Sequence, residues 1–98
     1  MSDTYRDYAQ LLAQFLDGSL AASQFRNVFQ SRFQSELREL DDELARLLDR
    51  VFADVEVFSE DAEVIASRPG MYIDEAELRR CIARAAEELR AISSRANY

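Results

Sequence analysis

The stretch DELARLLDRVFADVEVF, residues 42–58, shows the pattern that decides the fold class. Its apolar residues recur at intervals of three and four, so they form one stripe along an α-helix of 3.6 residues per turn. The stripe consists of Leu44, Leu47, Leu48, Val51, Phe52, Val55 and Phe58. The last five residues, DVEVF, alternate between polar and apolar and could form a short edge strand. They also continue the helical stripe without a break, so the spacing predicts a helix over 42–58.

Three other segments show the same spacing and predict helices over 4–17, 21–37 and 74–93. The first ends before Gly18, a common stop signal. The second begins at Ala21 or at Ser19, because alanine is a poor helix cap. The apolar stripes consist of Tyr5, Tyr8, Leu11, Leu12, Phe15 and Leu16 in the first segment, Phe25, Val28, Phe29, Phe33 and Leu37 in the second, and Leu78, Ile82, Ala85, Leu89 and Ile92 in the third.

Turn signals complete the fold prediction. Asp74 is suited to cap the last helix, with Glu77 closing a capping box. Pro69 and Gly70 occupy the central positions of a type II turn within the connection 59–73. Two glycines and one proline are too few for a sandwich or barrel. We therefore expect one domain over residues 1–98, an all-α four-helix bundle with an up-down course and a longer loop between its third and fourth helices.

The residues that most enzymes and metal sites need are missing from this chain. It has no histidine, the commonest general base and metal ligand. Its one cysteine, Cys81, cannot form an intramolecular disulfide or a zinc site, and its position predicts a half-buried small apolar residue. A carboxylate-based hydrolase would need two acids converging in a cleft, and the spacing suggests none. We expect no catalytic residue, no cofactor and no metal.

The net charge of the chain limits the classes of partner that it is expected to bind. The formal net charge of −7 disfavours direct binding of nucleic acid or of an anionic membrane surface, both of which attract cationic proteins. No apolar run is long enough to span a bilayer, and the first residues lack the pattern of a signal peptide. We expect a cytoplasmic protein, and a basic protein partner is the remaining possibility.

Five acidic residues and no basic residue lie in the segment 51–67. Acidic residues are unfavourable at the C-terminal end of a helix, where the helix dipole is negative. A structural explanation is that Ser59 caps a short helical turn and that Arg50 pairs with Asp54. The alternative is an interface, because Val57 is expected to point into solvent among acids. The residues alone favour these two interpretations equally.

Three passages resemble the colicin D immunity family, over roughly residues 8–92. They are FLDGSLAASQF at 15–25, LDRVFADVEVFSEDAEV at 48–64 and YIDEAELRRCIARAAEEL at 72–89. Members of this family are small bacterial helical bundles that neutralise a co-produced nuclease toxin. The chain departs from the family at Ala21, where a polar cap is usual before the second helix.

The resemblance implies a function for the acidic segment. The toxins that such proteins inhibit are basic ribonucleases that cut transfer RNA, and the carboxylates of the inhibitor take the place of RNA phosphates. The implied binding residues are Asp54, Glu56, Val57, Glu60, Asp61, Glu63, Tyr72 and Asp74. We expect a monomer or weak dimer when the protein is free. The alternative is an acidic adaptor or regulatory module that binds another basic protein surface.

Overall fold

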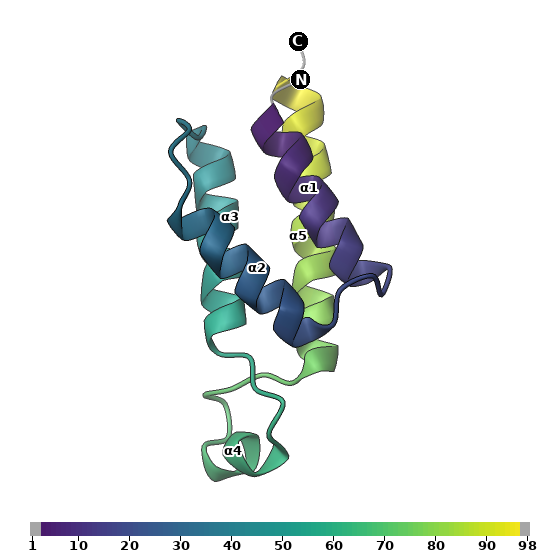
Figure 1. Ribbon diagram of the computed structural model, residues 1–98, viewed down its shortest axis with the longest axis vertical. Coiled ribbons are helices and arrows are strands. Elements are labelled where there is room, and N and C mark those ends of the chain that lie inside the picture. The colour runs from purple at the N-terminus through teal and green to yellow at the C-terminus, as the bar shows by residue number, and fades with distance from the viewer. Residues whose placement is uncertain (1–2, 97–98) are drawn as a thin grey trace.

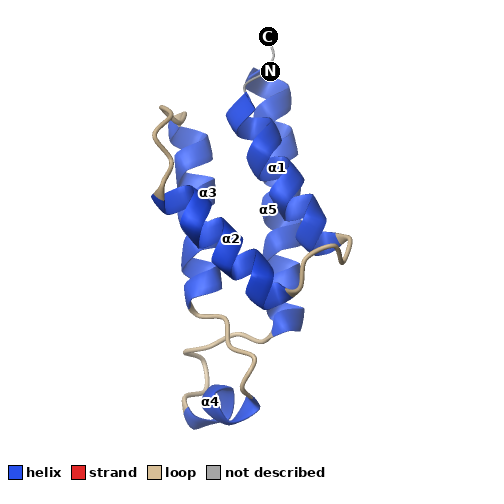
Figure 2. Cartoon of the chain, in the orientation of Figure 1, coloured by secondary structure: helices blue, strands red, loops and turns tan. Residues whose placement is uncertain are grey.

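The computed structural model describes residues 3–96, which form five α-helices and no strand (Figures 1 and 2). The helices are α1 (Asp3–Leu16), α2 (Ala22–Gln34), α3 (Asp42–Glu56), α4 (Ala62–Ser67) and α5 (Glu75–Ala96). The predicted all-α class is therefore confirmed. None of the helices within these residues is both long and apolar enough to cross a membrane.

The four long helices pack into a bundle, and the molecule as a whole is elongated, with extents of 47 × 25 × 21 Å. α5 lies against both α1 and α3, and α2 lies against α1 and α3 (Figure 1). The predicted stripes meet at the centre of this arrangement. Their buried members form one core cluster that includes the aromatic residues Tyr8, Phe15, Phe25 and Phe29.

α2 ends at Gln34, three residues before the predicted end at Leu37. The side chain of Leu37 is 97% exposed, so this last apolar position of the stripe does not face the core. Ala21 occupies the N-cap position of α2, and Gln24 accepts a 2.9 Å hydrogen bond from its backbone N–H. A glutamine at the third position thus stabilises a helix start that the alanine side chain cannot cap.

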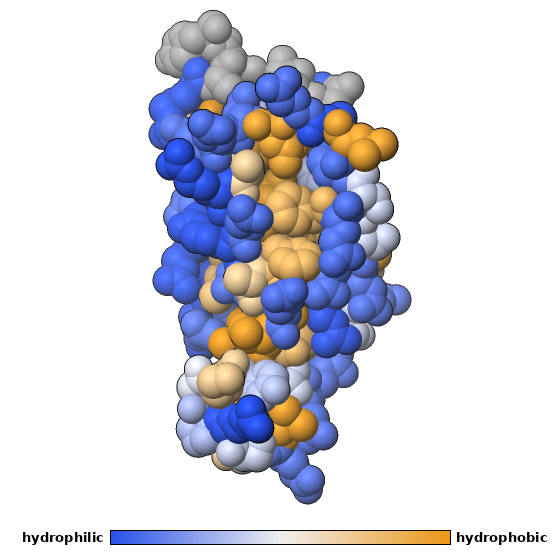
Figure 3. All heavy atoms as spheres, turned by 90° about the vertical axis from the view of Figure 1, so that its left-hand side faces the viewer, coloured by the Kyte–Doolittle hydropathy of each residue, from blue (hydrophilic) through white to orange (hydrophobic). Residues whose placement is uncertain are grey.

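A band of hydrophobic side chains runs lengthwise down the side of the molecule formed by α2 and α3 (Figure 3). Phe33 of α2 and Phe52 of α3 are half-buried and pack with ring centroids 5.8 Å apart. At the lower end of the bundle in Figure 1, the chain leaves α3, forms α4 and returns to α5. None of the residues of α4 is buried, so this helix lies outside the core.

Candidate functional site

α3 ends at Glu56, inside the acidic segment 51–67 and two residues before the predicted end at Phe58. Val57 is the C-cap residue, and the chain then turns so that Phe58 forms an isolated parallel bridge with Ile73. The N–H of Ile73 donates to the carbonyl of Val57 at 2.9 Å, and the N–H of Ser59 donates to the carbonyl of Ile73 at 3.0 Å. These two backbone hydrogen bonds close the connection that carries α4. We call residues 59–72 the α4 loop.

The α4 loop is ordered by short polar side chains and a tight turn. Asp61, rather than Ser59, caps α4, because its Oδ1 accepts a 2.9 Å hydrogen bond from the N–H of Glu63. Ser59 supports this cap by accepting a 3.1 Å hydrogen bond from the N–H of Asp61. At the far end, Gly70 has a φ of +85° and the N–H of Met71 donates to the carbonyl of Arg68 at 3.0 Å. This is the predicted type II turn.

Four acidic side chains of this region are exposed: Glu56, Glu60, Asp61 and Glu63. None of the ion pairs among the residues that the structure describes involves any of the four. Arg68 is the only basic residue between Arg50 and Arg79 in the sequence. The negative potential of the four exposed acids is therefore accessible to solvent and to a partner.

Asp74 joins this group from the other side of the α4 loop. Its Oδ1 accepts a 2.9 Å hydrogen bond from the N–H of Glu77, so it caps α5 as predicted. Among the described residues no hydrogen bond from the N–H of Asp74 to Glu77 completes the predicted capping box. The Glu77 side chain instead accepts a 2.9 Å hydrogen bond from Arg80. Asp74 thus has a structural role as the cap of α5. Because its side chain is also exposed, it can contact a partner as well.

A shallow groove brings three acids together between the α4 loop and the start of α2. Its lining includes Glu60, Asp74 and Glu75, with Ala22 and Ile65 supplying apolar surface. Glu75 was not among the predicted binding residues, and its four-residue spacing from Arg79 is the one that suits an ion pair on a helix surface. That pair is present at 3.3 Å on the surface. Adjacency to Asp74 at the start of a helix is the signal that would have included it.

Asp54 lies apart from the other acids. It is half-buried on the side of α3 that faces α5, where it lines a crevice with Cys81 and Arg84. Residues two apart in an α-helix point about 200° away from each other, so Asp54 and Glu56 lie on opposite sides of α3. Burial raises the pKa of the Asp54 carboxyl, and the nearby charges of Arg50 and Arg84 oppose this rise.

The two remaining predicted residues border the α4 loop. Val57 is 36% exposed beside the bridge that closes the loop, and Tyr72 is half-buried next to that bridge. We call Glu56, Val57, Glu60, Asp61, Glu63, Tyr72, Asp74 and Glu75 the acidic end. No group of three or more metal-ligating side chains within residues 3–96 is arranged to hold an ion.

The charge of the whole chain is concentrated around this end. Residues 51–78 contain eight acids and one arginine, whereas the rest of the chain has eleven of each. This segment thus accounts for the entire formal net charge of −7. A molecule with such an uneven charge distribution presents one end preferentially to a cationic partner during diffusional encounter.

Comparison with protein-family models gives a match over residues 3–89 to the family described as bacterial self-protective colicin-like immunity. Neither the curated proteins nor the solved structures contain a match to this chain. The family match spans most of the chain, from α1 through nearly all of α5. The chain therefore belongs to the bacterial self-protective colicin-like immunity family, whose members are proteins that bind and inhibit a bacterial toxin.

Proposed function

We propose that this immunity protein inhibits a basic nuclease toxin, a ribonuclease that cleaves transfer RNA, by covering its phosphate-binding cleft with the acidic end. The observation that carries the proposal is the exposure of Glu56, Glu60, Asp61 and Glu63 without an ion pair among the described residues. A nuclease cleft is lined by cations that bind phosphates. Carboxylates are the side chains that pair best with such cations.

The lack of internal ion pairs favours binding. When a partner arginine approaches Glu60 or Glu63, no salt bridge among the described residues has to be broken first. Each new contact is a charge-assisted hydrogen bond, which is stronger than a neutral one. The uneven charge of the molecule also speeds the encounter with a cationic toxin by about 10- to 1000-fold over an uncharged pair. Fast association suits a protein that must act before the toxin does.

Apolar contacts at the same end complement the charges. Val57 and Met71 are 36% and 57% exposed, respectively, and Tyr72, which follows Met71 in the chain, is half-buried. Tyrosine and methionine are enriched in the cores of protein interfaces, where they bury area and exclude water around polar contacts. We therefore place these residues at the centre of the contact and the carboxylates around it. Asp54, on the opposite side of α3 from Glu56, lies outside this contact.

The test is a charge reversal of the acidic end with a matched control. The variant E56R/E60R/E63R changes three exposed acids of the acidic end, and E39R/D49R/E87R makes the same change of charge at three exposed acids elsewhere. Both are compared with the wild-type protein for affinity to the cognate toxin and for protection of transfer RNA from cleavage. We expect the first variant to lose affinity by about 100-fold or more and the control by less than about tenfold.

Two results would contradict this proposal. If both triple variants lose affinity equally, net charge rather than the acidic end governs binding. If the wild-type protein binds the toxin but the toxin cleaves no RNA, the nuclease class is wrong and the acidic end covers another kind of basic site. Circular dichroism and thermal unfolding of both variants establish that the helices remain folded.

A further inference from the structure

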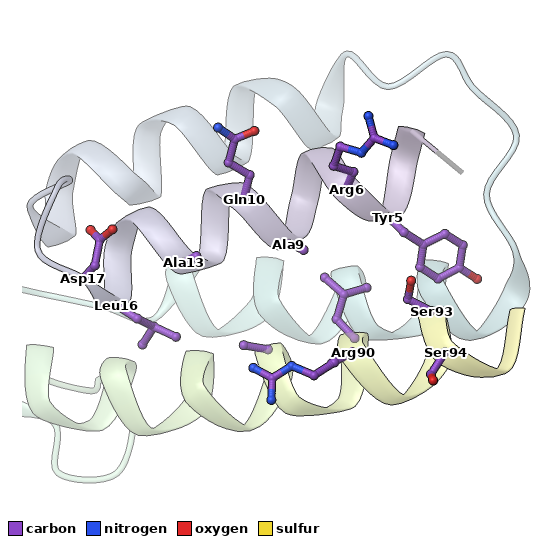
Figure 4. A pocket seen from close by; sticks show the side chains of 12 residues that line it. Tyr5, Arg6, Ala9, Gln10, Ala13, Leu16, Asp17, Arg90, Ser93 and Ser94 are labelled. Carbon is purple, nitrogen blue, oxygen red and sulfur yellow. The ribbon is translucent and has the colours of Figure 1, made fainter. Parts of the chain in front are cut away.

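The α4 loop projects from the lower end of the bundle in Figure 1. None of residues 59–72 is buried or belongs to the core, whereas Phe58 and Ile73 at the base of the loop pack in the core or against it. The long helices, by contrast, are joined through the core. Even where α1 and α5 leave a groove between them, the lining residues Tyr5 and Leu89 are 4% and 1% exposed (Figure 4). Opening the α4 loop therefore uncovers only half-buried side chains, whereas separating two long helices exposes the core.

The hydrogen bonds of the α4 loop are almost all internal. Only the two backbone bonds at its base, between Ile73 and Val57 and between Ser59 and Ile73, join it to the rest of the described chain. The others lie inside the loop, such as the 3.1 Å bond from the N–H of Ile65 to the carbonyl of Asp61. None of the ion pairs among residues 3–96 involves a residue of the loop. A segment with so few ties to the core opens at a lower free energy than the core itself.

Like charges meet when the α4 loop is closed. Glu60 of the loop lines the same groove as Asp74 and Glu75 at the start of α5. Arg79 pairs with Glu75, but no cation among the described residues pairs with Glu60 or Asp74. Bringing these carboxylates together costs free energy and opposes closure. A cation bound between Glu60 and Asp74 would remove this cost and join the two sides of the groove.

We propose that the α4 loop opens and closes as one unit while the bundle stays folded, and that a basic toxin holds it closed by placing cations in this groove. The second half rests on the proposed function, because it requires the acidic end to contact the toxin. Opening breaks the hydrogen bonds of Ser59 and Ile73 at the base and moves Glu60 away from Asp74. A toxin arginine that contacts both of these carboxylates binds only the closed form, so it shifts the equilibrium towards closure.

Native-state hydrogen exchange of the free protein tests the independent opening, with the wild type compared with Leu44→Ala. Leu44 is 1% exposed and lies at the start of α3, at the end of that helix far from the α4 loop (Figure 1). Its truncation destabilises the bundle whether the loop is open or closed. Exchange of the core amide of Leu48 should therefore become about 30-fold faster or more. Exchange of the loop amides of Ser59 and Ile65 should stay unchanged, because their opening leaves the bundle folded.

The proposal is overturned if the amides of Ser59 and Ile65 speed up by the same factor as that of Leu48, since the loop and the bundle would then unfold together. Unequal opening free energies for Ser59 and Ile65 would overturn the opening of the loop as one unit. If Leu44→Ala does not fold, Ile82→Val makes the same comparison at another fully buried position, with an expected change of about two- to tenfold in the core.

Exchange in the complex with the cognate toxin tests the second half of the proposal. At a free toxin concentration of about 100 times the dissociation constant, exchange of the Ser59 and Ile65 amides should slow by about 100-fold. The control is the amide of Ser35, which donates to the carbonyl of Ser31 at the other end of α2 and should be unaffected. Loop amides that exchange equally fast in the complex would overturn this half. Since the free-protein measurement involves no toxin and protection of transfer RNA involves no exchange, either proposal can fail while the other stands.

Discussion

The hydroxyl group of Tyr8, whose side chain is fully buried, donates a 3.0 Å hydrogen bond to the carboxylate of Glu36 in the connection between α2 and α3. Arg38 in the same connection donates to Glu36 at 2.9 Å and to Asp7 of α1, also at 2.9 Å. Arg38 thus links the carboxylates of Glu36 and Asp7. The Glu36 carboxylate also accepts the hydrogen bond from the buried Tyr8. This network fixes the α2–α3 connection against α1 without an apolar contact from Leu37.

The network predicts a specific loss of stability in acid. The guanidinium of Arg38 is the main cause that lowers the pKa of Glu36 to about 2, with help from the Tyr8 hydroxyl. A carboxyl group with a lowered pKa in the folded state stabilises that state fully above its ordinary pKa, and this contribution is lost as the pH falls towards 2. Glu36→Gln should therefore destabilise the protein at pH 7 and flatten the decline of stability between pH 5 and 2.

Urea unfolding at a series of pH values measures this effect, with Glu39→Gln as the control. Glu39 is an exposed residue three positions away in the same connection, and its carboxylate forms no hydrogen bond or ion pair within residues 3–96. Parallel stability curves for the wild type and Glu36→Gln would show that Glu36 has the same pKa in the folded and unfolded states. That result would contradict the role assigned to Arg38.

A second prediction concerns the joint between α1 and α5. The guanidinium of Arg79 lies 4.6 Å from the centroid of the Phe15 ring and donates a 3.2 Å hydrogen bond to the carbonyl of Phe15. This carbonyl is one of the last of α1, where a cation is favoured. Arg79→Ala should lower the free energy of unfolding by about 1–2 kcal/mol. The neighbouring Arg80→Ala removes only a surface pair with Glu77 and should have no measurable effect in the same denaturation experiment.

The sequence could predict the long helices because each buries a continuous stripe against the others. α3 and α5 begin within one residue of the predicted starts, and α1 ends within one residue of its predicted end. α4 has no buried residue, so it leaves no stripe in the sequence. The connection after the early end of α2 is held by hydrogen bonds from Tyr8 to Glu36 and from Arg38 to Asp7, about 30 positions apart in the sequence, and such contacts have no local signal.

The candidate site, like the fold, could be predicted only where the residues that form it are close together in the sequence. Clustering along the sequence identified the acids of the α4 loop, since a loop closed at its base keeps its residues together. The structure places Asp54 apart from these acids, because a helix turns neighbouring residues to opposite sides. The helical wheel that placed Val57 in solvent also separates Asp54 from Glu56. Glu75 joins the others only through the return of the chain at Ile73, which the sequence does not specify.

The turn at the far end of the α4 loop gives a third prediction. Gly70 and Gly18 have similar positive φ angles, +85° and +88°, and a Cβ at either position would have no other atom within 4 Å. Substitution by alanine therefore costs only backbone strain, about 1–2 kcal/mol at each position. Gly70→Ala should destabilise the bundle no more than Gly18→Ala does. Only Gly70→Ala should weaken the toxin complex. Equal affinities for the two variants would show that the shape of the α4 loop does not contribute to binding.

The last prediction concerns the crevice between α3 and α5, where Asp54 lies beside Cys81. Burial is the main cause that raises the pKa of the Cys81 thiol, and the negative charge of Asp54 raises it further, whereas a hydrogen bond from Arg84 at 3.8 Å lowers it. Asp54→Asn should therefore lower the thiol pKa and speed alkylation by iodoacetamide at pH 8, because the thiolate is the reactive form. Arg84→Ala should slow the same reaction.

Since Asp54 lies outside the acidic end, Asp54→Asn should leave toxin affinity unchanged while Glu56→Gln weakens it. Weakening by Asp54→Asn would extend the contact around α3 towards Cys81.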